Sequence, residues 1–217
     1  MGKIQVLTKE QQIILAEVRM NFFFQQFYFT GGTALSASYL QHRYSEDLDF
    51  FTEKEFDSRA LFTVVDLWSR QHDFTFTSEF LQVVHIFFLT FKNNEKIKVD
   101  FGFYPYKRIE EGRIVNGMRT DSLTDIAVNK LLTLTQRSSI KDFVDLYFLL
   151  QTFTIWDLIE GVQVKFKRQL EPFIVASDFL KVEDFDYLPK MIKPLTLHEL
   201  KTFFTQRAKE LGKKSIE

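Results

Sequence analysis

The chain has 217 residues, 45% of them hydrophobic, and a formal net charge of −1. It is long enough to bury a substantial core, and its near-neutral charge excludes a protein that binds nucleic acid through an overall basic surface. The absence of cysteine excludes disulfides and thiolate metal sites. No apolar run reaches the ~20 residues of a membrane span, and residues 1–6 lack the apolar stretch of a signal peptide. We therefore expect a cytoplasmic protein with no membrane partner.

The hydrophobic periodicity changes along the chain from mixed strand and helix to helix alone. Thr8 and Gln11 have the spacing of a capping box, which predicts a helix start at residue 9. An Asn-Asn turn predicts that residues 82–91 and 96–104 form an antiparallel hairpin. In chain order we expect a helix over 9–25, a strand over 27–30, a helix opened by Thr33, a strand over 47–52, a helix over 58–72, strands within 73–104, a short strand over 113–115 and helices after 120.

Phenylalanine is unusually frequent, with 26 copies. Several lie in runs, such as 22–24 and 87–88, within apolar periodic segments. Aromatic side chains that stack on nucleic-acid bases are expected among basic residues instead. We therefore interpret these phenylalanines as core residues.

The stretch from Gly31 to Asp49 combines a glycine pair with two aspartates. Glycines let the backbone approach a ligand closely, and the start of the helix that follows favours a phosphate. Asp47 and Asp49 lie two apart on a predicted strand, so they share one face while Leu48 and Phe50 face the core. Two carboxylates suit Mg²⁺, which also binds substrate phosphates. Each motif alone is more often a turn or a solvated strand face, but in this order they predict a site for a metal-bound polyphosphate.

Asp100 is a third candidate carboxylate, on the strand predicted over 96–104. It alternates with Lys98 and Gly102, so it should lie on the polar face of that strand. A solvent-facing aspartate is one interpretation of this position. A functional aspartate beside Asp47 and Asp49 is the other.

Two helices after residue 120 carry a set of charges. Lys130 lies near the edge of an apolar helix face, and Asp142 and Asp145 lie three apart on one face of the next helix. A solvated helix edge would also explain Lys130 and Arg137, and an acidic first turn would explain Asp142.

The segments Gly31–Leu35 and His42–Phe51 together resemble the nucleotidyltransferase toxins of the AbiEii/AbiGii type, which belong to the polymerase-beta-like nucleotidyltransferase superfamily. The resemblance extends to about residue 150, and the last third of the chain carries no motif that we can assign. It implies an α+β nucleotidyltransferase fold, with a mixed sheet flanked by helices over residues 1–120 and a helical region over 121–217.

The resemblance also implies roles for single residues. Asp47, Asp49 and Asp100 would hold Mg²⁺, with Mn²⁺ as an alternative, and all three would count as catalytic. The lysine and the aspartate of the family's helical motif match Lys130 and Asp142, which would complete the catalytic set. The nucleotide-binding residues would be Gly31, Gly32, Thr33, Arg43, Ser45 and Lys130. The wider superfamily often has serine where this chain has Thr33, which keeps the hydroxyl and adds a methyl group.

The activity implied is transfer of NMP from an NTP to an acceptor, expected to be RNA such as tRNA. The chain would act as the toxin of a type IV toxin–antitoxin or abortive-infection system, with an antitoxin encoded nearby. Two alternatives stay open. One is a non-catalytic module that binds a nucleotide or a partner protein, and the other is a Mg²⁺-dependent phosphotransferase that acts on a small molecule or a protein.

Overall fold

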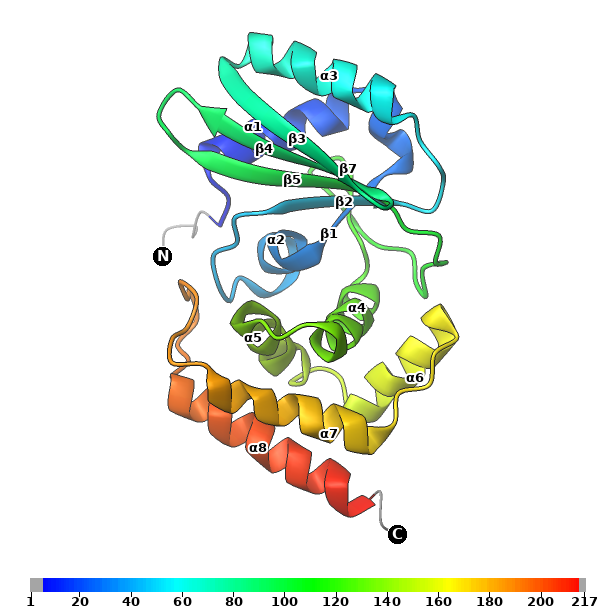
Figure 1. Cartoon of the computed structure of the whole chain (residues 1–217), viewed down its shortest axis with the longest axis vertical. Helices are drawn as coiled ribbons and strands as arrows, with labels where there is room; N and C mark the ends of the chain where they lie inside the picture. Colours follow the sequence, from blue (N-terminus) through cyan, green and yellow to red (C-terminus); the bar gives the residue numbers. More distant parts are fainter. Residues whose placement is uncertain (1–5, 215–217) are drawn as a thin grey trace. The chain divides into compact units, whose positions relative to one another are not determined.

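The computed structural model describes residues 6–214 and confirms the predicted α+β class (Figure 1). Its residues fall into two compact units. Unit 1 contains residues up to Tyr39, Ser45–Lys107 and Gly112–Asp121, and unit 2 contains Leu40–Tyr44, Arg108–Glu111 and residues from Ser122 onward. The predicted division into 1–120 and 121–217 includes residues 1–5 and 215–217, which lie outside the described residues. The expectation about a signal peptide also concerns residues 1–5. That division stays a prediction.

Unit 1 is built on a five-stranded mixed sheet with the strand order β1-β2-β5-β4-β3. Its elements are α1 (Lys9–Met20), η1 (Phe22–Gln26), β1 (Tyr28–Thr30), α2 (Gly31–Leu35), β2 (Leu48–Thr52), α3 (Ser58–Gln71), β3 (Phe74–Leu81), β4 (Val84–Phe91), β5 (Lys96–Phe103), β6 (Ile114–Val115) and β7 (Met118–Arg119). A π-helix, η2 (Ser36–Leu40), continues α2. The strands β2 and β5 are parallel, whereas the other neighbours in the sheet are antiparallel. The predicted hairpin is confirmed as β4 and β5.

The two faces of the sheet differ in what covers them. We call the face that carries Asp49 and Asp100 the front face, and the opposite face the back face. Phe101 on the back face lies against Phe24, whose ring also contacts Trp68, and both pairs of ring centroids are 5.2 Å apart. Figure 1 shows α1 and α3 on the back side of the sheet and α2 on the other. The aromatic core of unit 1 therefore lies between the back face and these two helices.

Several predictions about local structure need correction. The predicted helix over 9–25 ends at Met20, because Asn21 leaves the helical conformation and its side chain accepts from the next turn. The capping box of Thr8 and Gln11 is confirmed. The helix expected to open at Thr33 begins at Gly31. The short strand near residue 114 has a partner, β7, which the sequence analysis missed because two residues are too few to show a period.

The interpretation of the phenylalanine runs as core is only partly right. Phe87 is fully buried on the back face, but the next residue, Phe88, lies on the front face with 39% of its surface exposed. Phe22 is 81% exposed. Successive side chains of a strand point to opposite faces, so a pair of adjacent phenylalanines cannot enter the same core.

Unit 2 is helical. Its elements are α4 (Leu123–Gln136), α5 (Ile140–Leu149), α6 (Ile155–Phe166), α7 (Pro172–Leu180), η3 (Lys181–Asp184) and α8 (Leu197–Lys214). Capping interactions fix the starts of α6 and α8, where Thr154 pairs with Asp157 and Thr196 pairs with Glu199. None of the helices in residues 6–214 combines the length and the apolar character that crossing a membrane requires.

Candidate active site

The front face of unit 1 carries a row of three polar side chains from three adjacent strands. Thr30 on β1 pairs with Asp49 on β2, and Asp49 pairs with Asp100 on β5. Partners in register on neighbouring strands point to the same face, so the two aspartates lie side by side. Leu48 and Phe50 point the other way and are fully buried, as predicted. Strand pairing thus brings together carboxylates that are 51 positions apart in the sequence.

Gly31 provides the space that the Asp49 carboxylate occupies. A Cβ atom placed on Gly31 would lie 2.0 Å from Asp49 Oδ2, which is far inside contact distance. The φ angle of Gly31 is +73°, a backbone conformation that favours glycine. The first glycine of the pair therefore has two separate physical reasons to be glycine, and both serve the position of Asp49.

The segment that leads into β2 is held by hydrogen bonds from α1 and α2. The hydroxyl of Thr33 donates to the backbone carbonyl of Asp47. The Gln11 side chain donates to the carbonyls of Ser45 and Glu46, at 2.9 and 3.1 Å. Asp47 itself lies just before the first residue of β2. The Thr33 hydroxyl thus positions the segment that carries Asp47.

Asp100 is half-buried and has unequal contacts at its two oxygens. Lys98 Nζ forms an ion pair with Oδ2, whereas Oδ1 is buried and has no hydrogen-bond partner among residues 6–214. Burial raises the pKa of Asp100, the charge of Asp47 raises it further, and Lys98 acts in the opposite direction. Across the described part of the chain, no three His, Asp or Glu side chains are grouped closely enough to hold a metal ion by themselves.

Asp121 is a buried residue of unit 1 that the sequence analysis missed. Its Oδ2 accepts from the Thr30 hydroxyl at 3.0 Å, and its backbone carbonyl accepts from the Tyr39 hydroxyl at 2.7 Å. Its N–H donates to the carbonyl of Phe29. The Asp121 carboxylate therefore holds the Thr30 hydroxyl at the β1 end of the row. Its only sequence signal was an aspartate just before a helix start, which is usually a cap.

The residues predicted in the helical region belong to a buried charge network in unit 2. Asp145 lies at its centre and is fully buried. Arg43 binds it through two nitrogens, with Nε 2.6 Å from Oδ1 and Nη2 2.8 Å from Oδ2. His42 Nε2 lies 2.7 Å from Oδ1, and Lys130 Nζ lies 2.6 Å from Oδ2. Polar residues between a helix and a strand are usually solvated, but His42 and Arg43 are both buried against Asp145.

Lys130 joins this network to Asp142. Its ammonium lies 2.8 Å from Asp142 Oδ1, and Arg137 Nε lies 2.9 Å from Asp142 Oδ2. The solvated helix edge that the sequence left open for Lys130 does not apply, since only 11% of its side chain is exposed. It does apply to Arg137, whose side chain is 63% exposed. Asp142 does lie in the acidic first turn of α5, but its carboxylate is paired with these two cations.

The network shifts the pKa values of its members away from their ordinary values. Burial would raise the pKa of Asp145, but the charges of Lys130 and Arg43 outweigh it and hold that pKa well below the usual range. Burial also opposes the charged form of Asp142, yet Lys130 and Arg137 lower its pKa. Burial lowers the pKa of His42, although Asp145 acts against it. At neutral pH the network therefore consists of charged carboxylates and cations with a neutral His42.

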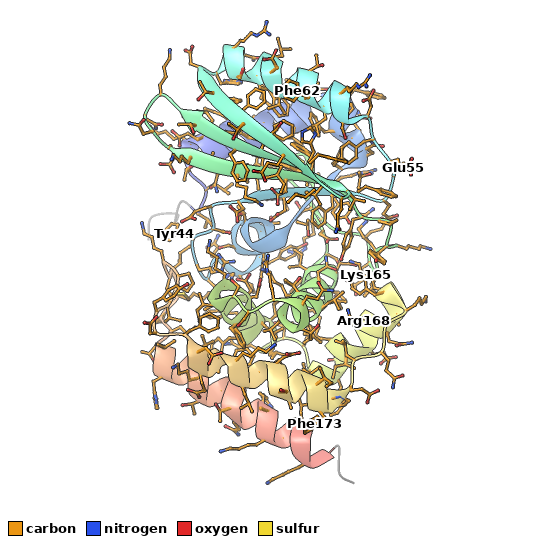
Figure 2. All side chains as sticks on the ribbon, viewed as in Figure 1. Tyr44, Glu55, Phe62, Lys165, Arg168 and Phe173 are labelled. Atoms are coloured by element: carbon orange, nitrogen blue, oxygen red, sulfur yellow. The ribbon has the colours of Figure 1, made fainter. Side chains whose placement is uncertain are left out.

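The predicted site residues fall into these two groups. Those in unit 1 are Gly31, Gly32, Thr33, Ser45, Asp47, Asp49 and Asp100. Those in unit 2 are Arg43, Lys130 and Asp142. Unit 2 also contains Asp145 and His42, which were not among the predicted site residues. A second buried pair of unit 2 lies apart from them, where Lys165 (labelled in Figure 2) donates to Asp125 at 2.6 Å.

The fold with this row of aspartates is that of a nucleotidyltransferase. A candidate nucleotidyltransferase from Helicobacter pylori aligns over 96% of this chain and 97% of its own, with a TM-score of 0.60 and 22% identity. MenT4, a nucleotidyltransferase toxin from Mycobacterium tuberculosis, aligns over 93% of this chain and 83% of its own, with a TM-score of 0.55 and 16% identity. At these identities the likeness establishes the fold.

The sequence establishes the family. Residues 13–215 match the family described as "Nucleotidyl transferase AbiEii toxin, Type IV TA system", and the chain belongs to it. The predicted resemblance is thus confirmed, and the protein is a nucleotidyltransferase of this toxin family. A further relative is an uncharacterised protein of Aquifex aeolicus, which is 34% identical over 211 residues, or 94% of this chain and 97% of its own length.

Proposed function

We propose that this protein transfers NMP from an NTP to an RNA acceptor, with tRNA included in that class, in a reaction that depends on Mg²⁺. We further propose that it is the toxin of a type IV toxin–antitoxin system whose antitoxin is its protein partner. The observation that carries the proposal is the row of Thr30, Asp49 and Asp100 on adjacent strands. Its two carboxylates lie side by side, with Asp49 against Gly31, and a metal-bound polyphosphate would bind beside them.

The residues present fit a divalent cation. Proteins usually bind Mg²⁺ through one or two carboxylates together with substrate phosphates and water. Asp49 and Asp100 supply such a pair of carboxylates. The buried Oδ1 of Asp100 has no hydrogen-bond partner among residues 6–214, so it could bind the cation. Asp47 would contribute from the start of β2. Mg²⁺, or Mn²⁺ in its place, would supply charge neutralisation at the reacting phosphate and the leaving pyrophosphate.

Asp100 is the proposed proton acceptor for the acceptor hydroxyl. The hydroxyl proton would pass to the Asp100 carboxylate as the hydroxyl oxygen forms a bond to the α-phosphorus. The bond from that phosphorus to the bridging oxygen of the β-phosphate breaks, and pyrophosphate leaves. Its buried Oδ1 has no hydrogen-bond partner among residues 6–214, so this oxygen could accept the proton.

The triphosphate would be held by the backbone of Gly31 and Gly32 at the start of α2. Thr33 and Ser45 would hold the segment that carries Asp47 in place. In unit 2 we propose Lys130 as a phosphate-binding cation, because 11% of its side chain is exposed. Arg43 and Asp142 would support it as members of the buried network.

Labelled nucleotides test the transfer chemistry. Purified protein with Mg²⁺ and total RNA should incorporate label from the α-phosphate of an NTP, and none from the γ-phosphate. Label from the γ-phosphate would instead identify a phosphotransferase, and binding of NTP without any transfer would identify a non-catalytic module. Either result would contradict the proposal.

Paired variants assign the activity to the aspartate row. Asp49→Asn and Asp100→Asn should each abolish transfer and weaken binding of Mn²⁺ measured alone by calorimetry. Asp73→Asn is a matched control, because Asp73 is an exposed aspartate with a positive φ angle that asparagine tolerates well. Full transfer by either row variant would remove that aspartate from the proposed site.

A further inference from the structure

An open cleft of about 550 Å³ lies on the front face of unit 1, beside the aspartate row. Its floor is the outer part of the sheet, formed by β3, β4 and β5. The side chains that line it include Asp47, Thr77, Phe88, Lys96 and Lys98. Of these five residues, only Asp47 belongs to the triphosphate site described above.

The strand register orders the cleft relative to the aspartates. Lys98 precedes Asp100 on the same face of β5 and pairs with Phe88 on β4, which pairs with Thr77 on β3. The next row outward begins with Lys96 on β5. Rows two residues apart are separated by about 7 Å along a strand. A chain that lies along β5 therefore passes the first lysine and then the second as it leaves Asp100.

Phe88 offers an aromatic surface in the middle of this floor. Its ring lies on the front face, and 39% of the residue is exposed. Nucleobases stack on such rings whatever their sequence, because every base has a π-face. Lys96 and Lys98 place positive charge beside the ring, although Lys98 also forms an ion pair with Asp100. An aromatic ring beside basic side chains is the combination expected of a surface that binds single-stranded nucleic acid.

The sign of the charge changes along the cleft. The end nearest the aspartate row is acidic, with Glu46 and Asp47, and the floor beyond it carries Lys96 and Lys98. Phosphates are repelled by the acidic end and attracted by the lysines. A terminal hydroxyl is neutral and tolerates the acidic end. This polarity matches an RNA strand whose hydroxyl terminus reaches Asp100 while its phosphates follow the lysines.

We propose that this cleft binds the single-stranded end of the RNA acceptor, with a base stacked on Phe88 and phosphates on Lys96 and Lys98. The inference rests on the proposed function for the identity of the acceptor. It adds the place and the residues that bind it.

Fluorescence anisotropy with a short 5′-fluorescein single-stranded RNA of mixed sequence tests the proposal, without NTP or metal. Phe88→Leu keeps an apolar side chain but removes the ring, and it should weaken binding by roughly tenfold or more. Phe88→Trp should preserve or strengthen binding. Lys96→Ala should lower the slope of log affinity against log salt by about 0.7, the value for one phosphate contact on a single strand.

Matched controls come from elsewhere in unit 1. Phe22→Leu changes a more exposed phenylalanine, at 81%, and Arg70→Ala removes an exposed cation on α3. Both should leave RNA affinity and its salt dependence unchanged. Losses equal to those of the cleft variants would overturn the assignment of binding to the cleft.

The experiment separates this inference from the proposed function. Equal RNA affinity for wild type, Phe88→Leu and Lys96→Ala would overturn the cleft assignment, even if NMP transfer to RNA succeeds. RNA binding that depends on Phe88 and Lys96 in a protein that transfers no NMP would support the cleft and contradict the proposed activity.

Discussion

Gly31 and Asp49 fit together only because Gly31 lacks a side chain. The Asp49 carboxylate oxygen lies 2.0 Å from the place where a Cβ on Gly31 would be, and the backbone of Gly31 has a φ of +73°. One residue of the glycine pair thus determines where one carboxylate of the aspartate row lies.

Gly31→Ala should reduce NMP transfer by at least ~10²-fold, because a displacement of about 1 Å at a reacting group costs that much. The methyl group would push the Asp49 side chain away, and the left-handed backbone would add about 1–2 kcal/mol of strain. Steady-state transfer and thermal unfolding measure the two effects separately. Gly212→Ala is the matched control, because a Cβ there meets nothing within 4 Å on helix α8. It should keep full activity. Loss of stability without loss of activity in the Gly31 variant would contradict the prediction.

Thr33→Val should cost about 1–2 kcal/mol of stability and lower transfer, because it leaves the Asp47 carbonyl without the hydroxyl that it accepts from. Thr33→Ser keeps that hydroxyl and should retain both properties. Urea unfolding and transfer assays on the two variants give the comparison. Similar behaviour of serine and valine would show that the methyl group, rather than the hydroxyl, matters at this position.

Lys130→Met should destabilise the protein by about 3 kcal/mol, near the lower end of the ~3–5 kcal/mol that breaking a buried ion pair costs. The ammonium contacts both Asp142 and Asp145, but Arg43 and Arg137 remain to offset their charges. Denaturant unfolding measures the loss. Lys201→Met, which removes a lysine from a partly exposed pair with Glu183, should change stability by less than about 1 kcal/mol. A Lys130 variant as stable as wild type would place its ammonium outside the structural network.

Acid should weaken unit 2 through Asp142 and Asp145. The folded protein lowers the pKa of both, so the unfolded chain binds protons more readily, and stability falls as pH falls. The contribution is complete above the ordinary aspartate pKa of about 4 and declines below it. The difference in unfolding free energy between wild type and Asp142→Asn should therefore shrink as the pH is lowered from 7 to about 3. A difference that stays constant over that range would show that Asp142 is not stabilised as a carboxylate.

The sequence predicted the parts of the site that depend on local patterns. Alternation placed Leu48 and Phe50 in the core and Asp100 on the opposite face from Phe101, and all of this is confirmed. It could not place Asp49 beside Asp100, because the register of two distant strands is decided by packing. The family resemblance supplied that expectation.

The buried charge network of unit 2 could not be predicted from local sequence patterns. His42 and Arg43 lie between a helix and a strand, where polar residues are usually solvated. Their partner, Asp145, is more than 100 positions away, at separations of 103 and 102. A charge is buried only when such a partner is present, and no local period records one. Phe88 was wrongly predicted to be a core residue because it is apolar. The alternation of side chains along β4 places it on the exposed front face.

The parallel pairing of β2 with β5 also has a consequence for how the protein comes into being. Parallel strands need a crossover, and here α3, β3 and β4 intervene before β5 can dock. Closing so long a connection has an entropic cost, so such pairings form slowly compared with local hairpins. During synthesis, a nascent chain that ends before β5 holds Asp49 without Asp100 beside it. The two carboxylates become neighbours only when the whole sheet has emerged and folded, so a partly made chain on the ribosome does not yet have the pair.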